Sequence, residues 1–183
     1  LKQLEYYGST KSRGGLVFCS RQQEARALAK AFTAAGYPSQ ALTNEDSVIK
    51  REEAVARLES GALKYLISVD IFNEGIDIPC VDQIILLRDT RSKIVFTQQL
   101  GRGLRLFPGK TSTLILDFIG NYQNNYLIPQ ALTNDRSLNK DRLVADLKEQ
   151  VVYGLSTINF DEIAYQKILA VIARTKLDSL KHL

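Results

Sequence analysis

A chain of 183 residues is long enough for one domain, or for one domain with an appended segment. Hydrophobic residues make up 45% of it and charged residues 24%, so we expect a globular protein with a sizeable core. No apolar run approaches the roughly 18 residues of a membrane-spanning helix, and no membrane partner is expected. The formal net charge of +4 permits a polyanionic partner without requiring one.

Short apolar runs alternate with helical patterns over the first 120 residues. Five apolar runs predict strands, at residues 16–19, 39–42, 65–69, 83–87 and 113–116. Apolar positions three and four residues apart predict helices over residues 22–35, from the cap at Ser47 to the turn at Gly61, and over residues 92–104. Continuous apolar strands separated by helices are typical of a parallel sheet covered on both faces. The expected fold class is therefore α/β.

The pattern changes after Asn121. Residues 122–136 are polar and irregular, and beyond them residues 137–153 and a segment that begins at Asp161 carry apolar side chains at helical spacing. We therefore expect an α/β domain over residues 1–126, followed by a helical C-terminal extension over residues 127–183.

The cysteines and the histidine exclude several kinds of chemistry. Cys19 and Cys80 lie in apolar stretches, so we expect both to be reduced and buried, as in a cytosolic protein. The sequence has no CxxC motif and its one histidine is His182, so neither a metal site nor a catalytic Ser-His-Asp set is expected. The sequence contains no Met, and we expect it to be part of a longer protein.

Three predicted strands are followed by polar residues. Parallel sheets bind ligands at the carboxyl ends of their strands, and the candidates there include residues 20–21, 70–79 and 88–91. The hydroxyl of Ser20 and the guanidinium of Arg21 could contact a phosphodiester backbone, as could Thr43 and Asn44 after the second strand. Each pair could equally cap a helix, and the sequence leaves both interpretations open.

Glycine, aspartate and proline follow the third predicted strand. Gly75 would allow backbone N–H groups to face an anion, and Asp77 could accept a hydrogen bond from a ribose hydroxyl. The alternative is an ordinary turn built from the same residue types.

The segment from Gln98 to Arg105 carries two arginines. On a helix, Arg102 and Arg105 share a face and could hold phosphate oxygens through bidentate hydrogen bonds. A solvated helix with two surface arginines is equally compatible with this spacing. The sequence has no GxxxxGK[ST] motif and no acidic cluster at a strand end, so another domain would have to complete a nucleotide site.

Three segments, in this order, resemble the motifs of superfamily 2 helicases. GLVFCS resembles motif IV, LISVDIFNEGIDIPCVDQII resembles motif V, and QQLGRGLR resembles motif VI. The run LRDTRSKIVFTQQLGRGLR, with Gln98 where DEAD-box proteins usually have His, is similar to helicases of restriction enzymes and DNA repair. The tail segments LIPQALTNDRSLNKD and GLSTINFDEIA resemble large prokaryotic DEAD/DEAH-type helicases.

The resemblance implies a second RecA-like motor domain, with a parallel sheet sandwiched between helices. In such helicases the nucleotide binds between two RecA-like domains. By resemblance, Arg102 and Arg105 would reach the γ-phosphate, one of them as the arginine finger. Gly75 and Asp77 would face the nucleotide, and Gln98 would couple the site to the cleft.

The same resemblance assigns nucleic-acid contacts. Ser20, Arg21 and the start of motif V at Val69 would face the nucleic-acid backbone. Val69 stands where many relatives have a phosphate-contacting Thr, so a side-chain contact at this position is in doubt.

The expected function is that of the C-terminal motor domain of an ATP-dependent helicase or translocase, with DNA as the expected polymer and RNA as the alternative. ATP with Mg²⁺ is the expected cofactor, with the metal held mainly by an N-terminal P-loop domain of the same parent chain, which is the expected partner. The chain alone should hydrolyse no ATP, and its expected location is a prokaryotic cytoplasm. The alternative is a non-catalytic nucleic-acid-binding or interaction module, which would be expected to have lost Arg102 and Arg105.

Overall fold

The structure is a computed structural model of the 183-residue chain. It describes residues 2–7, 12, 14–69, 78–88, 101, 105, 107–118, 139, 141–142, 144–145 and 162–174. The chain forms two compact units, the first made of Leu1–Asp89 and Ile94–Ile119, the second of Thr90–Lys93 and Gly120–Leu183. The expected boundary at residue 126 lies outside the described residues and stays a prediction.

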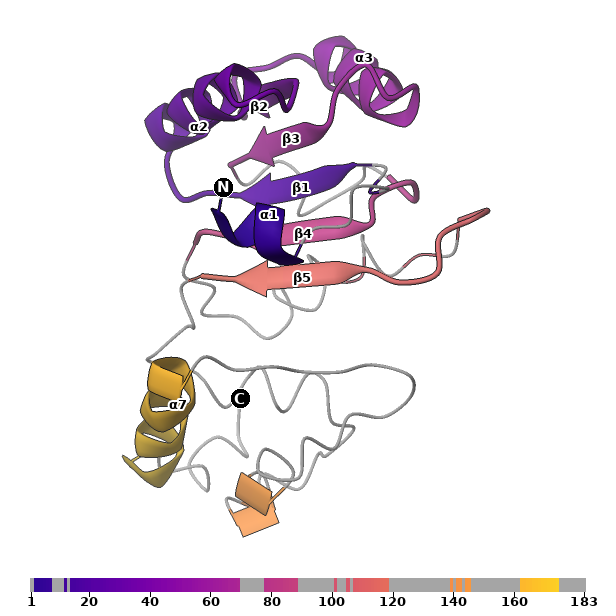
Figure 1. Ribbon diagram of the computed structural model, residues 1–183. Coiled ribbons are helices and arrows are strands. Elements are labelled where there is room, and N and C mark those ends of the chain that lie inside the picture. The colour runs from indigo at the N-terminus through magenta and orange to yellow at the C-terminus, as the bar shows by residue number, and fades with distance from the viewer. Residues whose placement is uncertain are drawn as a thin grey trace. The chain divides into compact units, whose positions relative to one another are not determined.

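A parallel sheet of five strands forms the centre of the first unit (Figure 1). The strands are β1 (Gly15–Phe18), β2 (Ser39–Leu42), β3 (Tyr65–Ser68), β4 (Gln83–Leu86) and β5 (Leu114–Asp117). Their order across the sheet is β2-β3-β1-β4-β5, and every adjacent pair is parallel. All five strands lie within a residue of the predicted apolar runs. The predicted α/β class and parallel sheet are therefore confirmed.

Three described helices belong to the same unit: α1 (Lys2–Tyr7), α2 (Gln22–Ala34) and α3 (Val48–Glu59). The predictions for α2 and α3 are confirmed, because α2 buries Ala25, Ala29 and Phe32 and α3 buries Ala54, Val55 and Leu58 at helical spacing. Of the helix predicted over residues 92–104, only Gly101 is described, and it is helical.

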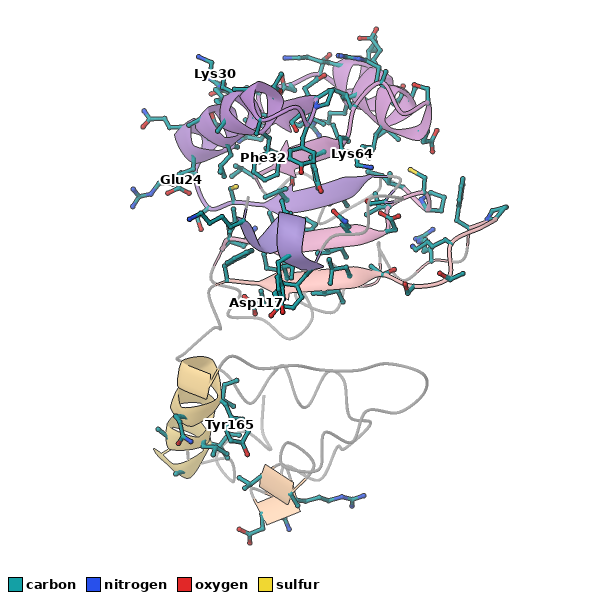
Figure 2. The ribbon with its side chains drawn as sticks, viewed as in Figure 1. Glu24, Lys30, Phe32, Lys64, Asp117 and Tyr165 are labelled. Atoms are coloured by element: carbon teal, nitrogen blue, oxygen red, sulfur yellow. The ribbon has the colours of Figure 1, made fainter. Side chains whose placement is uncertain are left out.

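Side chains on one face of the sheet pack against α1 and α2. Val17 of β1 and Ile67 of β3 share a buried cluster with Leu4 of α1 and Phe32 of α2. In Figure 2, Phe32 extends from α2 toward the sheet, whereas Lys30 extends away from it. Alternate strand residues point to the opposite face, and β1, β3 and β4 are buried along their whole length. The central strands are therefore covered on both faces.

A buried tyrosine packs against the backbone of Gly15 at the amino end of β1. Tyr65 is 2% exposed, and its ring makes edge-to-face contacts with Phe32 and Tyr37. Its hydroxyl donates to Oε1 of buried Gln83 over 2.5 Å. A Cβ atom at Gly15 would lie 2.4 Å from Cε1 of the tyrosine ring, so only glycine fits there without displacing the ring.

The second unit is described in part. Helix α7 (Glu162–Arg174) corresponds to the predicted final helix, and its Ile168 and Ile172 are buried against Tyr165 and Val144. Earlier in this unit, Asn139 Oδ1 accepts hydrogen bonds from the backbone N–H groups of residues 141 and 142, which are helical. No helix among the described residues is long and apolar enough to cross a membrane.

Candidate nucleic-acid interface

All five strands run in one direction, so the residues that follow them lie at one edge of the sheet. Ser20 and Arg21 follow β1, Thr43 and Asn44 follow β2, and residue 88 follows β4. The chain leaves β1 toward β2 but leaves the neighbouring β4 toward β5, in the opposite direction. Ligands of open α/β sheets bind at such a reversal, at the carboxyl ends of the strands. The end of β1 is therefore the best-placed part of this edge for a ligand.

The first turn of α2 begins without a side-chain cap. Arg21 occupies the N-cap position with extended backbone angles (φ −130°, ψ 142°), and its side chain makes no capping hydrogen bond. Ser20 lies one residue before that position, so the alternative in which Ser20 caps the helix is not what the structure shows. Both side chains are exposed. The Arg21 side chain therefore leaves the N–H groups at the positive end of the α2 dipole uncapped.

The loop between β2 and α3 is closed by its own hydrogen bonds. Thr43 is only 2% exposed, and its N–H and hydroxyl donate to Asp46 Oδ2 over 2.7 and 3.3 Å. The N–H of Asp46 returns a bond of 3.0 Å to the carbonyl of Thr43. Ser47 caps α3 by accepting from the N–H of Lys50 over 3.3 Å, as predicted. The Thr43 hydroxyl thus has an internal partner, and the N-terminus of α3 is capped.

Asn44 stands at the tip of this loop and is exposed. Its Oδ1 accepts a hydrogen bond of 2.8 Å from Nε2 of Gln22, in the first turn of α2. Its backbone carbonyl accepts from Nη2 of Arg51 over 3.2 Å. An exposed ion pair of 2.8 Å between Arg26 and Glu45 joins the same two segments. The ends of β1 and β2 are therefore bridged into one continuous polar surface.

Charge within the loop is balanced. The Asp46 carboxylate also pairs with the ammonium of Lys50, four residues later on α3. Burial alone would raise the pKa of Asp46, but hydrogen bonds from Lys50 and Thr43 outweigh it and hold that pKa below its usual range. Asp46 is therefore ionised at neutral pH.

Val69, the last described residue in the first part of motif V, points into the core. It is 8% exposed, belongs to the same buried cluster as Val17, and donates its N–H to the Leu42 carbonyl over 3.3 Å. The described structure therefore offers no route for a ligand to the Val69 side chain. Neither the residue type at position 69 nor the burial of its side chain therefore supports a side-chain contact with phosphate.

Most of the predicted nucleotide site lies outside the described residues. This is so for Gly75, Asp77, Gln98 and Arg102, whose roles stay predictions. Arg105 is described and exposed, and its carbonyl accepts a hydrogen bond of 3.0 Å from the Lys110 ammonium.

The described residues offer little for other chemistry. Among them, no group of three or more His, Cys, Asp or Glu side chains could hold a metal ion. Burial, with a smaller contribution from Glu24, raises the pKa of the Cys19 thiol to about 12, and Cys80 is shifted in the same direction by its burial. Both cysteines are free and buried, as predicted, and neither thiol is poised to react.

Sequence reasoning missed the residues that connect the two loops. Gln22, Arg26, Asp46 and Arg51 were not singled out, although their hydrogen bonds hold the loop that carries the exposed Asn44. The local signal was a carboxylate three residues after Thr43 and just before the helix cap. The bridges to α2 span about twenty residues of chain and have no local signature.

The helicase conserved C-terminal domain family matches residues 1–107 of the chain. The protein named "Putative ATP-dependent helicase IRC3" from Saccharomyces cerevisiae is 32% identical over 136 residues, covering 73% of this chain and 20% of its own length. The "Putative mitochondrial ATP-dependent helicase irc3" of Schizosaccharomyces pombe is 28% identical over 176 residues, covering 91% and 28%. The Escherichia coli type I restriction enzyme EcoKI endonuclease subunit is 28% identical over 131 residues, covering 64% and 11%.

The chain thus spans less than a third of the length of these curated relatives. Two of them are yeast proteins, one named as mitochondrial, and the third is from Escherichia coli, so the relatives do not support a specifically prokaryotic origin, which stays a prediction. Among solved structures, the yeast DEAD-box splicing factor Prp28 matches with a TM-score of 0.65 at 18% identity, over 96% of this chain and 35% of that one. This match confirms a RecA-like fold. The chain belongs to the helicase conserved C-terminal domain family, as the resemblance of its motifs IV, V and VI implied.

Proposed function

We propose that this chain is the second motor domain of an ATP-dependent helicase or translocase, and that its β1 and β2 ends hold the nucleic-acid backbone. The family membership supports the motor assignment. The single observation that carries the backbone contact is the uncapped first turn of α2, where Ser20 and Arg21 are exposed beside the bridged Asn44. Backbone N–H groups, a hydroxyl, an amide and a guanidinium are the groups that proteins use to bind phosphates.

The proposed contacts read the backbone and not the bases. Arg21 supplies a permanent positive charge, and the α2 dipole adds a partial one. Thr43 and Val69 are left out of this surface because both side chains are buried. Binding should therefore show little sequence preference and should weaken steeply with salt.

For the chemical step, we propose that Arg102 and Arg105 complete an ATP site whose P-loop and magnesium ligands belong to a preceding domain. Arginines placed against the transferring phosphoryl group stabilise its developing charge, and such a finger is worth roughly 10³ to 10⁵ in rate. Because hydrolysis removes that contact, the two domains would close with ATP and open after it.

DNA is the proposed polymer. A relative named as a restriction endonuclease subunit and the Gln at the start of motif VI favour DNA, whereas the Prp28 structure is titled a splicing factor. The free, buried Cys19 and Cys80 fit a reducing compartment such as the cytoplasm.

The motor assignment is tested by the ATPase activity of the full-length protein, with and without single-stranded DNA, duplex DNA and RNA. Stimulation by DNA, together with a loss of two or more orders of magnitude in Arg102→Ala, would be expected of an arginine finger. Lys30→Ala, which removes a positive charge from the outer side of α2, is the matched control. A DNA-stimulated rate that Arg102→Ala leaves untouched would favour the binding-only module.

The backbone contact is tested separately, by measuring the dissociation constant for a labelled oligonucleotide at several salt concentrations. Arg21→Ala should weaken binding about fivefold and lower the slope of log K against log salt by about 1, because one phosphate contact is lost. An unchanged slope would remove Arg21 from the interface.

A further inference from the structure

We propose that Asp46 is a positioning residue for nucleic-acid binding: its carboxylate fixes the loop between β2 and α3 so that Asn44 stands against the first turn of α2. This inference rests on the proposed function, because it concerns the surface to which Ser20, Arg21 and Asn44 belong. Asp46 itself would not touch the nucleic acid.

The carboxylate uses both of its oxygens to hold the loop. Oδ2 accepts from the N–H and the hydroxyl of Thr43, at 2.7 and 3.3 Å, and Oδ1 accepts from the ammonium of Lys50. The Asp46 N–H bonds back to the Thr43 carbonyl at 3.0 Å. The four-residue turn is thus closed by side chain and backbone together, and only residues 44 and 45 remain at its tip.

The tip is where the loop meets α2. With its Oδ1 engaged by Gln22, Asn44 keeps its amide nitrogen for another partner, and that nitrogen carries two N–H donors. Gln22 directly follows Arg21 in the chain, so this hydrogen bond ties Asn44 to the segment that carries Arg21. We infer that one phosphate group is bound by donors from both segments, and a turn displaced by about 1 Å would disturb that arrangement.

A bare carboxylate beside a polyanion would oppose binding. Asp46 avoids this because its side chain is 12% exposed and is paired with Lys50, which is itself 54% exposed. The pair adds no net charge to the surface, while the carboxylate also lies at the positive end of the α3 dipole. Position 46 therefore requires a strong hydrogen-bond acceptor whose negative charge is neutralised by a neighbouring cation.

The test uses the full-length helicase and four variants: Asp46→Ala, Asp46→Asn, Asn44→Ala and Glu53→Ala. Asparagine at position 46 keeps an acceptor for the Thr43 N–H but loses the ion pair. Glu53→Ala is the matched control, because it removes an exposed carboxylate of α3 that lies outside the turn. The measurements are the dissociation constant for a labelled oligothymidine, the ATPase rate against its concentration, and the melting temperature.

We expect Asp46→Ala to raise the dissociation constant about fivefold to tenfold, the effect of one misplaced hydrogen-bonding group on a charged ligand. Asp46→Asn should weaken binding less than Asp46→Ala, and Glu53→Ala should change binding less than about twofold. In the ATPase assay the change should appear in the half-saturating oligonucleotide concentration and not in the saturated rate, a separation that general unfolding would not produce.

The outcomes separate this inference from the proposed function. Weaker binding in both Asn44→Ala and Asp46→Ala supports the positioning role. Weaker binding in Asn44→Ala with normal binding in Asp46→Ala overturns it and leaves the proposed surface intact. Normal binding in Asn44→Ala and in Arg21→Ala would remove the surface itself. Should Asp46→Ala fail to fold, Asp46→Asn decides: a folded Asp46→Asn with wild-type affinity and half-saturation refutes the role.

Discussion

Replacing Gly15 with alanine should destabilise the α/β unit through a clash that its core cannot relieve. A Cβ atom at position 15 would lie 2.4 and 2.5 Å from Cε1 and Cδ1 of the Tyr65 ring, and 3.3 Å from Cβ of Gln83. Non-bonded carbon atoms pack at about 3.5 to 4.0 Å, so the ring would have to move by about 1 Å.

Three contacts hold the ring in place. Its centroid lies 5.2 Å from that of Phe32 and 6.0 Å from that of Tyr37, and its hydroxyl donates to Gln83, which is 3% exposed. Overpacking of a core costs about 1 to 3 kcal/mol. Breaking the hydrogen bond would add about 1 to 3 kcal/mol, because a buried acceptor is left unsatisfied. We expect a total loss of about 2 to 4 kcal/mol, since the ring and the backbone share the displacement.

The assay is urea unfolding of the chain, followed by circular dichroism. Gly61→Ala is the control, because Gly61 has a φ of +79° but no atom within 4 Å of the added Cβ. It should show only the cost of left-handed backbone, roughly 1 to 2 kcal/mol. A loss below about 0.5 kcal/mol in Gly15→Ala would mean that Tyr65 is free to move, and the reasoning from the clash would be wrong.

Three further predictions concern charge and reactivity. The pKa of Asp46 is lowered in the folded chain, so the stabilising effect of this carboxylate is present above its unfolded-state pKa of about 4 and is lost as pH falls through its folded-state pKa. The difference in unfolding free energy between wild type and Asp46→Asn, measured by urea unfolding, should therefore be constant from pH 8 to 5 and shrink only below about pH 4. A thiol reagent at pH 8 should not label Cys19 in the native chain but should label it in urea; rapid native labelling would contradict its burial. Replacing both Arg26 and Glu45 with alanine should change the free energy of unfolding by less than about 1 kcal/mol, because the pair is exposed; a larger loss in urea unfolding would show that it holds the loop.

The strands and the helix faces could be predicted because each depends on local pattern. Gly15–Phe18 and Tyr65–Ser68 are continuous apolar runs, and a strand buried on both faces requires such a run. The cap at Ser47 was predicted for the same reason, since a cap bonds within one turn of helix.

The candidate site was less predictable, because its geometry depends on contacts between distant residues. Thr43 and Asn44 were equal candidates from the sequence alone, whereas the structure buries Thr43 and exposes Asn44. What separates them is the Asp46 carboxylate on one side and the Gln22 amide on the other. Gln22 becomes a neighbour of Asn44 only when β2 pairs with β3 in the sheet.

The position of β1 has a mechanical consequence. At the amino end of this strand the incoming chain is tethered at Ser12. The Ser12 hydroxyl donates to Asp82 Oδ1 over 2.7 Å, and the Ser12 carbonyl accepts from the Lys64 ammonium. At the other end lie the exposed Ser20 and Arg21. All four residues of β1 are paired with β3 on one side and with β4 on the other. A pull between the tether and the carboxyl edge would therefore load both ladders in shear, so that their hydrogen bonds would have to break together and not one at a time.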